Sequence, residues 1–196
     1  VIPNAALNVA RQKHDENSRR VIAVGRLDYQ KGFDRLLKAW SLIPEKLRQT
    51  WRLDIFGQGE WQEMLEKMIP ELGIEGSAKI NPPTSDIFKE YSESAFHVMS
   101  SHYEGFPMVM IEAMSCGLPS VAFGFKCGPK DIISDGKNGI IVEEDNVEAL
   151  ALAMEKLIED DELRKRMSKK AEEIVSVYSE ERVMGIWTKC FSDLLS

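Results

Sequence analysis

Short apolar runs alternate with segments of helical spacing along most of this chain. Each run has four to six residues, the usual length of a buried strand. Strands separated by helices favour right-handed crossovers and parallel pairing. The pattern therefore predicts an α/β fold, with a mostly parallel sheet of about six strands and flanking helices. We expect the strands at residues 21–25, 52–56, 78–81, 95–100, 119–123 and 139–142, and the helices between them at 33–43, 61–69, 86–91 and 107–115.

The last part of the chain is different, because it shows helical spacing and no further strand. Segments 147–158, 162–175 and 179–194 carry apolar stripes, which predict three consecutive helices packed on the sheet. The last of them also carries Trp187 and Phe191, which suit either this core or a domain outside the chain.

The start of the chain predicts the domain organisation. Residues 11–20 are polar and unpatterned, which is typical of a linker. The chain begins VIPN without an initiator Met, so we expect a piece of a longer protein. The predicted division is a linker and first edge segment at 1–20, one α/β domain at 21–178, and a C-terminal helix at 179–196.

Composition argues against several classes of function. The net charge of −7 over 196 residues disfavours broad electrostatic binding to nucleic acid or to an anionic membrane. No signal peptide is visible, and no apolar run approaches the roughly 20 residues of a membrane span. Cys116, Cys127 and Cys190 are widely spaced without a metal-ligand pattern, as expected for buried thiols in a reducing compartment. We therefore expect a cytoplasmic protein.

The loop after the first predicted strand, GRLDYQKG, carries two cations, Arg26 and Lys31. Open parallel sheets bind ligands at the carboxyl ends of their strands. Arginine can grip a phosphate with two hydrogen bonds, and lysine adds a mobile positive charge. Two cations on one such loop of an acidic chain indicate a local anion site, although ordinary solvated side chains are the alternative.

The loop after the fourth predicted strand begins the stretch YEGFPMVMIEAMSC, which holds two acids. Glu104 precedes a helix whose start lies near Phe106 and Pro107, and Glu112 lies inside that helix. Free N–H groups and the helix dipole favour an anion at such a start. An acid on each side of an anion site matches a nucleotide sugar, whose diphosphate separates two hydroxylated rings. The alternative is that both are surface acids near a helix start.

Two further strand-end loops carry weaker signals. Gly57 and Gly59 follow the second strand, and they permit either a sharp turn or the approach of a flat base to the backbone. Asn81, Pro82 and Pro83 follow the third strand and could border the same base pocket. The chain has neither a dinucleotide-binding fingerprint nor a P-loop.

Four motifs in this order and spacing resemble one known family: GRLDYQKG, FGQGE, SSHYEGFPMVMIEAMSCGLPSVAF and GPKDIISDGKNGIIV. They look like the motifs of retaining glycosyltransferases of the GT4 type, and the resemblance runs from VIPN to the late helices. It implies the C-terminal, donor-binding Rossmann-like half of a GT-B enzyme. It also implies that an N-terminal acceptor-binding domain is missing here and that this piece alone is inactive.

The resemblance implies a role for each matching residue. Arg26 and Lys31 would hold the donor diphosphate, Glu112 would take the ribose hydroxyls, and Glu104 would contact the donor sugar. Arg26, Lys31 and Glu104 are therefore the expected catalytic residues. The expected donor-binding residues are Gly25, Gly57, Gly59, Asn81, Pro82, Gly105, Phe106, Pro107, Met108, Val109 and Glu112.

The reaction implied is transfer of a hexose-type sugar, with retained configuration, from a nucleoside-diphosphate sugar to a saccharide or lipid-linked acceptor. The run GPKDII is similar to bacterial cell-surface polysaccharide enzymes that use UDP-sugars. No metal and no cofactor are expected, and the intact protein would associate peripherally with the inner face of the membrane. Of the histidines, His97 is expected in the core, His102 in the site loop and His14 in an exposed linker.

Three other functions stay open at this point. A nucleotide-sugar epimerase can share the GT-B architecture, and a non-catalytic nucleotide-binding module or a purely structural domain would also fit. The sequence does not identify the base, the donor sugar, the acceptor or the linkage formed.

Overall fold

The computed structural model describes residues 4, 14–125 and 128–195. They form one six-stranded sheet in the order β3-β2-β1-β4-β5-β6, and all neighbouring strands are parallel. The predicted fold class is therefore confirmed. The strands are β1 (Arg20–Val24), β2 (Arg52–Phe56), β3 (Ala78–Asn81), β4 (Phe96–Met99), β5 (Ser120–Phe123) and β6 (Gly139–Val142).

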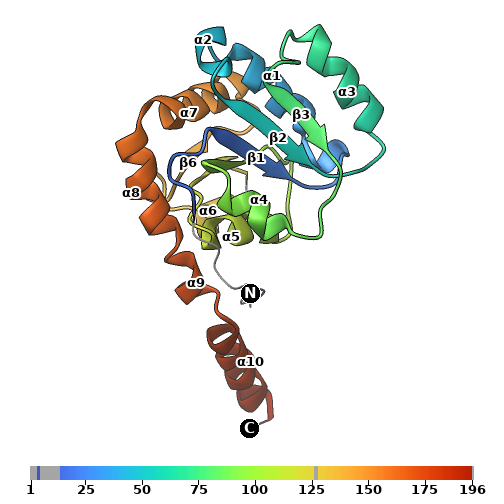
Figure 1. Ribbon diagram of the computed structural model, residues 1–196. Helices are drawn as coiled ribbons and strands as arrows, with labels where there is room; N and C mark the ends of the chain where they lie inside the picture. Colours follow the sequence, from blue (N-terminus) through green and yellow to red (C-terminus); the bar gives the residue numbers. More distant parts are fainter. Residues whose placement is uncertain (1–3, 5–13, 126–127, 196) are drawn as a thin grey trace.

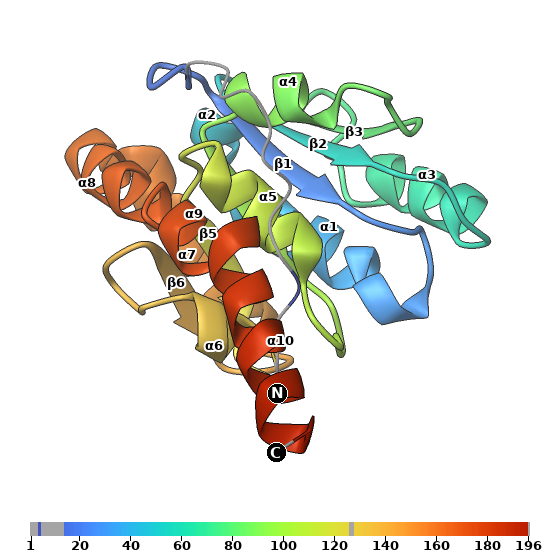
Figure 2. The same ribbon diagram turned by 90° about the horizontal axis from the view of Figure 1, so that it is seen from below.

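Helices cover both faces of the sheet. Helix α4 lies across the sheet from α1 and α3 (Figure 1, Figure 2). The helical segments are η1 (Tyr29–Lys31), α1 (Phe33–Leu42), α2 (Glu45–Arg48), α3 (Gln62–Glu71), α4 (Ile87–Ser92), α5 (Met108–Ser115), α6 (Pro129–Ile132), α7 (Val147–Glu159), α8 (Asp161–Ala171), α9 (Ile174–Val177) and α10 (Glu180–Leu195).

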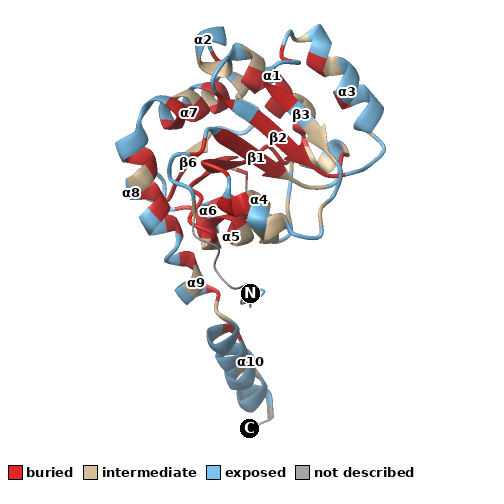
Figure 3. Cartoon of the chain, in the orientation of Figure 1, coloured by how far each residue is buried: buried red, intermediate tan, exposed pale blue. Residues whose placement is uncertain are grey.

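Strand alternation divides the apolar residues of the sheet between two cores. Val21 of β1 and Leu53 of β2 are paired in register and belong to the larger core, together with Trp40 of α1. Ile22 and Phe56 belong to a smaller core under α4 and α5. Because both faces are covered, the central strands are almost entirely buried (Figure 3).

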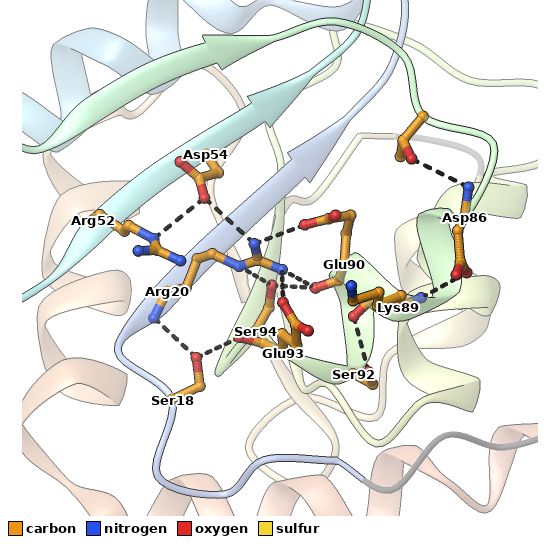
Figure 4. Close-up of polar contacts among 11 residues, drawn as sticks. Ser18, Arg20, Arg52, Asp54, Asp86, Lys89, Glu90, Ser92, Glu93 and Ser94 are labelled. Atoms are coloured by element: carbon orange, nitrogen blue, oxygen red, sulfur yellow. Dashed lines mark hydrogen bonds and ion pairs between the residues drawn. The ribbon is translucent and has the colours of Figure 1, made fainter.

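The chain enters the sheet through a buried ionic network (Figure 4). Arg20, which the sequence predicts as the end of a linker, instead opens β1. Its Nη1 lies 2.7 Å from Glu90 Oε2 of α4 and 3.6 Å from Asp54 Oδ2 of β2, and its Nε donates to Ser94 Oγ at 3.0 Å. Three elements are thus joined at the amino end of β1, away from the strand-end loops.

The predicted exposed linker is wrong for His14, whose ring is half-buried. Its Nε2 contacts Ser94 O at 2.8 Å and its Nδ1 lies 3.3 Å from Ser168 Oγ of α8. Residues 1–3 and 5–13 of the predicted linker, and Cys127, lie outside the described residues. Cys116 is buried and Cys190 is half-buried.

One prediction about the late helices is also wrong. The segment 162–175 is two helices, α8 and α9, and the apolar spacing continues across the break between them, so periodicity could not reveal it. For the last helix the sequence left two positions open, on this core or toward a domain outside the chain, and α10 extends away from the sheet (Figure 1). Trp187 and Phe191 stack on each other, with ring centroids 5.5 Å apart, and both remain exposed.

Candidate functional site

The loops after β1 and β4 meet at the point where the strand order of the sheet reverses. Strands β1 and β4 are neighbours, but the chain runs from β1 to β3 on one side and from β4 to β6 on the other. The loops that follow β1 and β4 are linked, because His102 N donates to Gln30 O at 2.8 Å and Ser100 Oγ donates to Lys31 O at 2.9 Å. Such a switch point is where open parallel sheets bind ligands.

Two of the three predicted catalytic side chains on these loops form an ion pair. Lys31 Nζ lies 2.6 Å from Glu104 Oε1, and the two side chains are only 17% and 8% exposed. Ser101 Oγ donates to the same carboxylate oxygen at 2.7 Å. Glu104 thus has a fixed orientation, and its charge is balanced by the cation that the sequence predicts as a phosphate ligand.

Arg26 reaches outward from the same loop. Its side chain is 73% exposed, and its Nε lies 3.5 Å from Asp28 Oδ2. Asp28 also caps η1 by accepting from Lys31 N at 3.2 Å. A guanidinium held at one edge and otherwise open to solvent is available to a phosphate.

Beside the ion pair lies a cavity of ≈ 370 Å³, which is in the range of small-molecule sites. Its lining is mostly apolar, and Arg26 and Glu112 are the charged side chains in it. Burial raises the pKa of Glu112, and the hydroxyl of Tyr91 opposes that shift. The lining residues are Val24, Gly25, Arg26, Phe56, Gly57, Gln58, Pro83, Thr84, Ile87 and Glu112.

Glycines let the loops after β1 and β2 interlock along the edge of the cavity. Gly25 N donates to Phe56 O at 3.0 Å, so the ladder of the sheet continues into the loops. A Cβ on Gly57 would lie 1.9 Å from Gly25 O, and one on Gly59 would lie 2.3 Å from Leu27 O. The backbone approach that these glycines permit is therefore loop against loop, and Gly57 also lines the cavity.

Gly25 joins the two halves of the site. It lines the cavity that holds Glu112, and the methylene groups of Lys31 lie 3.0 to 3.1 Å from where its Cβ would be. The structure therefore brings together Gly25, Arg26, Lys31, Gly57, Glu104 and Glu112 of the predicted site.

The predicted helix start is close to the observed one. Helix α5 begins at Met108 and Pro107 is its cap, so the helix starts one residue later than the sequence predicts. Gly105 is exposed, and Met108 and Val109 are half-buried. Phe106 instead packs edge-on against Tyr178, with ring centroids 5.6 Å apart, so its side chain belongs to the packing of α5.

The loop after β3 meets the cavity further along than predicted. Pro83 and Thr84 line it, whereas Asn81 and Pro82 are not among its lining residues. Asn81 lines a separate polar hollow of ≈ 390 Å³ with Arg52 and Asp54.

Neither His97 nor His102 is among the residues that line the cavity. His97 is confirmed as a core residue, 1% exposed, and burial lowers its pKa to about 3. His102 stacks on Tyr29, with ring centroids 4.2 Å apart, and burial lowers its pKa. His102 Nδ1 lies 3.9 Å from Asp145 Oδ1.

Sequence reasoning missed several residues that shape the site. Gln58, Thr84 and Ile87 line the cavity, and Gln30 and Ser101 contact Glu104. Their position in or just after the strand-end loops was the one signal that could have identified them. Their residue types carry no signal, because they are common in any loop.

The described residues contain no group of three or more His, Cys, Asp or Glu side chains arranged to hold a metal ion. None of the helices in the described part of the chain combines the length and apolarity that crossing a bilayer requires.

Comparison with known proteins identifies the family and the fold. Residues 6–174 match the family model described as glycosyl transferases group 1. The chain is 36% identical over 185 residues to an uncharacterized glycosyltransferase of Haemophilus influenzae, covering 94% of this chain and 52% of that protein. It is 39% identical over 168 residues to the amylovoran biosynthesis glycosyltransferase AmsD of Erwinia amylovora, covering 86% and 46%. The chain thus spans about half the length of these relatives.

Solved structures agree. The chain superposes with a TM-score of 0.91 and 30% identity on a mutant of S. aureus TarM in complex with Fondaparinux, alpha-GlcNAc-glycerol and UDP, covering 97% of this chain and 39% of that one. The apo form of the lipopolysaccharide outer core galactosyltransferase WaaB, at 22% identity, gives a TM-score of 0.84 and supports the fold alone. The six-stranded Rossmann-like domain is therefore that of GT-B glycosyltransferases.

Proposed function

We propose that this chain, which belongs to the glycosyl transferases group 1 family, is the donor-binding half of an enzyme. That enzyme transfers a sugar from a nucleoside diphosphate. The observation that carries this proposal is the placement of Arg26 and Glu112 in one cavity, beside the Lys31–Glu104 ion pair at the sheet's switch point. Cations for the diphosphate and acids for the hydroxylated rings of a nucleotide sugar thus lie together at this edge of the sheet.

Each part of the ligand has a partner in this arrangement. The base and ribose occupy the apolar cavity, where Glu112 accepts hydrogen bonds from the ribose hydroxyls. The diphosphate lies between Arg26, Lys31 and the start of α5, where backbone N–H groups and the helix dipole favour anions. The donor sugar lies against Glu104.

We propose a UDP-sugar as the donor and a hexose-type sugar as the group transferred. Support comes from TarM, whose structure contains UDP and superposes on nearly the whole of this chain. The acceptor is a saccharide or lipid-linked saccharide of a bacterial cell-surface polymer, as the name of the amylovoran relative suggests.

The reaction proceeds with retained configuration and without a metal or cofactor. Charge develops on the leaving diphosphate, and Arg26, Lys31 and the start of α5 stabilise it. Preorganised groups of this kind contribute the largest single part of many rate enhancements.

The other half of the enzyme binds the acceptor and completes the cleft. The chain covers about half of its relatives, which is the share expected for one of two domains of similar size. The intact protein acts in the cytoplasm and associates peripherally with the inner face of the membrane through that other half.

Replacing either cation tests the catalytic roles. In the intact protein, Arg26→Ala or Lys31→Ala lowers turnover by a factor on the order of 10²–10³. Steady-state rates of sugar transfer measure the loss, and Lys38→Ala, an exposed lysine paired within α1, is the control. Unchanged turnover in either variant removes that residue from the mechanism.

Titration calorimetry tests nucleotide binding directly. UDP, GDP and ADP are titrated into the intact protein in EDTA, alongside Glu112→Ala. We expect metal-free binding of UDP that weakens on substitution. Binding that survives Glu112→Ala contradicts the ribose assignment, and no binding of any nucleotide contradicts the proposed function. Incubation with a UDP-sugar and no acceptor then separates transfer from epimerisation, because an epimerase alone would yield a second nucleotide sugar.

A further inference from the structure

We infer that Tyr91 is a positioning residue for Glu112. The phenolic hydroxyl of Tyr91 orients the Glu112 carboxylate for the ligand. This inference rests on the proposed function, in which the Glu112 carboxylate binds the ribose hydroxyls of the ligand.

Tyr91 lies directly behind the cavity. It projects from α4 into the smaller core with Phe56 and Ala113 and is completely buried. Phe88 packs edge-on against its ring, with centroids 6.0 Å apart. Phe56 lines the cavity as well as this core, so the two spaces share a wall.

The hydroxyl of Tyr91 is an anomaly in that core. Within the described residues, Tyr91 Oη is buried without a hydrogen bond of good geometry. A buried polar group left in this state costs about 1–3 kcal/mol, so most buried hydroxyls find a partner. Phenylalanine would fill the same space without that cost.

Glu112, on the facing helix α5, is the acid that acts on this hydroxyl. Burial raises the pKa of Tyr91, and the Glu112 carboxylate raises it further. In return, the hydroxyl lowers the pKa of Glu112 against the effect of burial. Each group thus influences the pKa of the other, while Tyr91 Oη makes no hydrogen bond of good geometry to any described residue.

The surroundings of Glu112 leave this task to Tyr91. Glu112 forms no ion pair with any residue that the structure describes, and its carboxylate faces a cavity where Arg26 is the other charge. Cys116, which caps the C-terminal end of α5, also raises the pKa of Tyr91. A carboxylate only accepts hydrogen bonds, so a bond from Tyr91 to one oxygen would leave the other for the ribose hydroxyls. Fixing a flexible side chain before binding reduces the entropy that binding loses.

The substitution Tyr91→Phe removes the hydroxyl and keeps the ring. In the intact protein, we expect the dissociation constant for UDP to rise about tenfold, the size expected when a hydrogen bond to a charged group is lost. Preference for UDP over 2′-deoxy-UDP should fall, because the carboxylate no longer has a fixed orientation. Tyr178→Phe is the matched control, since it removes a second buried hydroxyl, one that reaches Asp131 O at 3.5 Å.

The pH dependence separates positioning from simple packing. Ribose binding needs the charged carboxylate, so affinity falls as the pH drops through the pKa of Glu112. Because Tyr91 lowers that pKa, Tyr91→Phe should move the acid loss of UDP affinity to higher pH. A purely structural role would reduce thermal stability and leave this midpoint in place.

A double variant completes the test. If Tyr91 acts through Glu112, then Tyr91→Phe weakens UDP binding in the wild type but not in the Glu112→Gln background. Equal losses in both backgrounds, or wild-type affinity in Tyr91→Phe beside a weakened Glu112→Gln, overturn the positioning role and leave the proposed function standing. A wild-type protein that binds no nucleotide overturns both.

Discussion

Glu112 is a half-buried carboxyl group that the fold keeps at a cost in stability. Its pKa is raised because burial disfavours the charged form, and no ion pair within the described part of the chain compensates. A raised carboxyl pKa means that the folded state binds a proton more readily than the unfolded state. Stability is therefore lost as the pH rises from the unfolded pKa through the folded one.

The substitution Glu112→Gln should consequently stabilise the protein at neutral pH while weakening UDP binding. Urea denaturation measures the gain in the free energy of unfolding, which should vanish below the unfolded pKa of about 4.3. Glu148→Gln, at an exposed acid on α7, serves as the control. A loss of stability at neutral pH in Glu112→Gln would contradict this account.

His97 makes the fold sensitive to acid. The ring is buried against Ser120, with Nδ1 3.1 Å from Ser120 Oγ, and burial lowers its pKa to about 3. The His97 ring therefore binds a proton near pH 6.5 in the unfolded state but stays neutral at that pH in the folded state. Stability should fall as the pH drops from about 6.5 towards 3, by up to about 1.4 kcal/mol per pH unit from this residue.

A pH series of denaturation curves for the wild type and His97→Gln isolates that contribution. The variant starts from a lower stability but should lose less between pH 6.5 and 4. His14→Gln provides the comparison, since its ring is half-buried at the surface of α8. Identical slopes for wild type and His97→Gln would contradict the buried neutral state.

At the scale of elements, the Arg20 network joins β1, β2 and α4. The Arg20 side chain is 7% exposed, and Glu90, Asp54 and Glu93 surround its guanidinium. Breaking a buried pair by removing one partner leaves uncompensated charge. Arg20→Ala should therefore lower the free energy of unfolding by about 3–5 kcal/mol.

Arg19 gives the matched control because it is the preceding residue and is exposed. Arg19→Ala should change stability by no more than about 0.5 kcal/mol. Chemical denaturation compares the two variants, and a small effect of Arg20→Ala would show that the surrounding acids find other partners.

The elements also show what the sequence could predict. The strands and long helices follow from hydrophobic spacing, because a buried face repeats over several residues. Segments such as η1, α2 and α6 have three or four residues and are too short to carry such a repeat. The break between α8 and α9 keeps the spacing of one helix, so only tertiary structure reveals it.

The candidate site was predictable only in part. The strand-end rule placed Arg26, Lys31 and Glu104 on neighbouring loops, but it could not tell that Lys31 and Glu104 pair with each other. Tyr91 looks like any apolar helix residue in the sequence. Its relation to Glu112 depends on how α4 and α5 pack, which no local pattern encodes.

At the scale of the whole molecule, α10 projects beyond the body of the domain (Figure 3). Its Met184, Trp187, Phe191 and Leu194 are exposed. We propose that the other half of the enzyme covers these side chains, because an exposed apolar face of this kind marks a site of interaction.

The double substitution Trp187→Ser and Phe191→Ser tests this. In the 196-residue chain it should change the free energy of unfolding by no more than about 0.5 kcal/mol, since the side chains are exposed. In the intact protein it should lower the melting temperature. Leu157→Ala, in the core, should cost about 2–5 kcal/mol in both and shows that the assay responds. No difference between the two contexts would mean that α10 has no partner in the other half.

The interlocked loops after β1 and β2 restrict how such a domain can diverge in evolution. Gly25 O occupies the place of a side chain at Gly57, so a new sequence for either loop has to preserve this close contact with the other. Mutations that change ligand preference are therefore expected at cavity-lining side chains outside this loop contact, such as Thr84 and Ile87. An engineer who wishes to change the nucleotide would redesign those positions and transplant both loops as one unit.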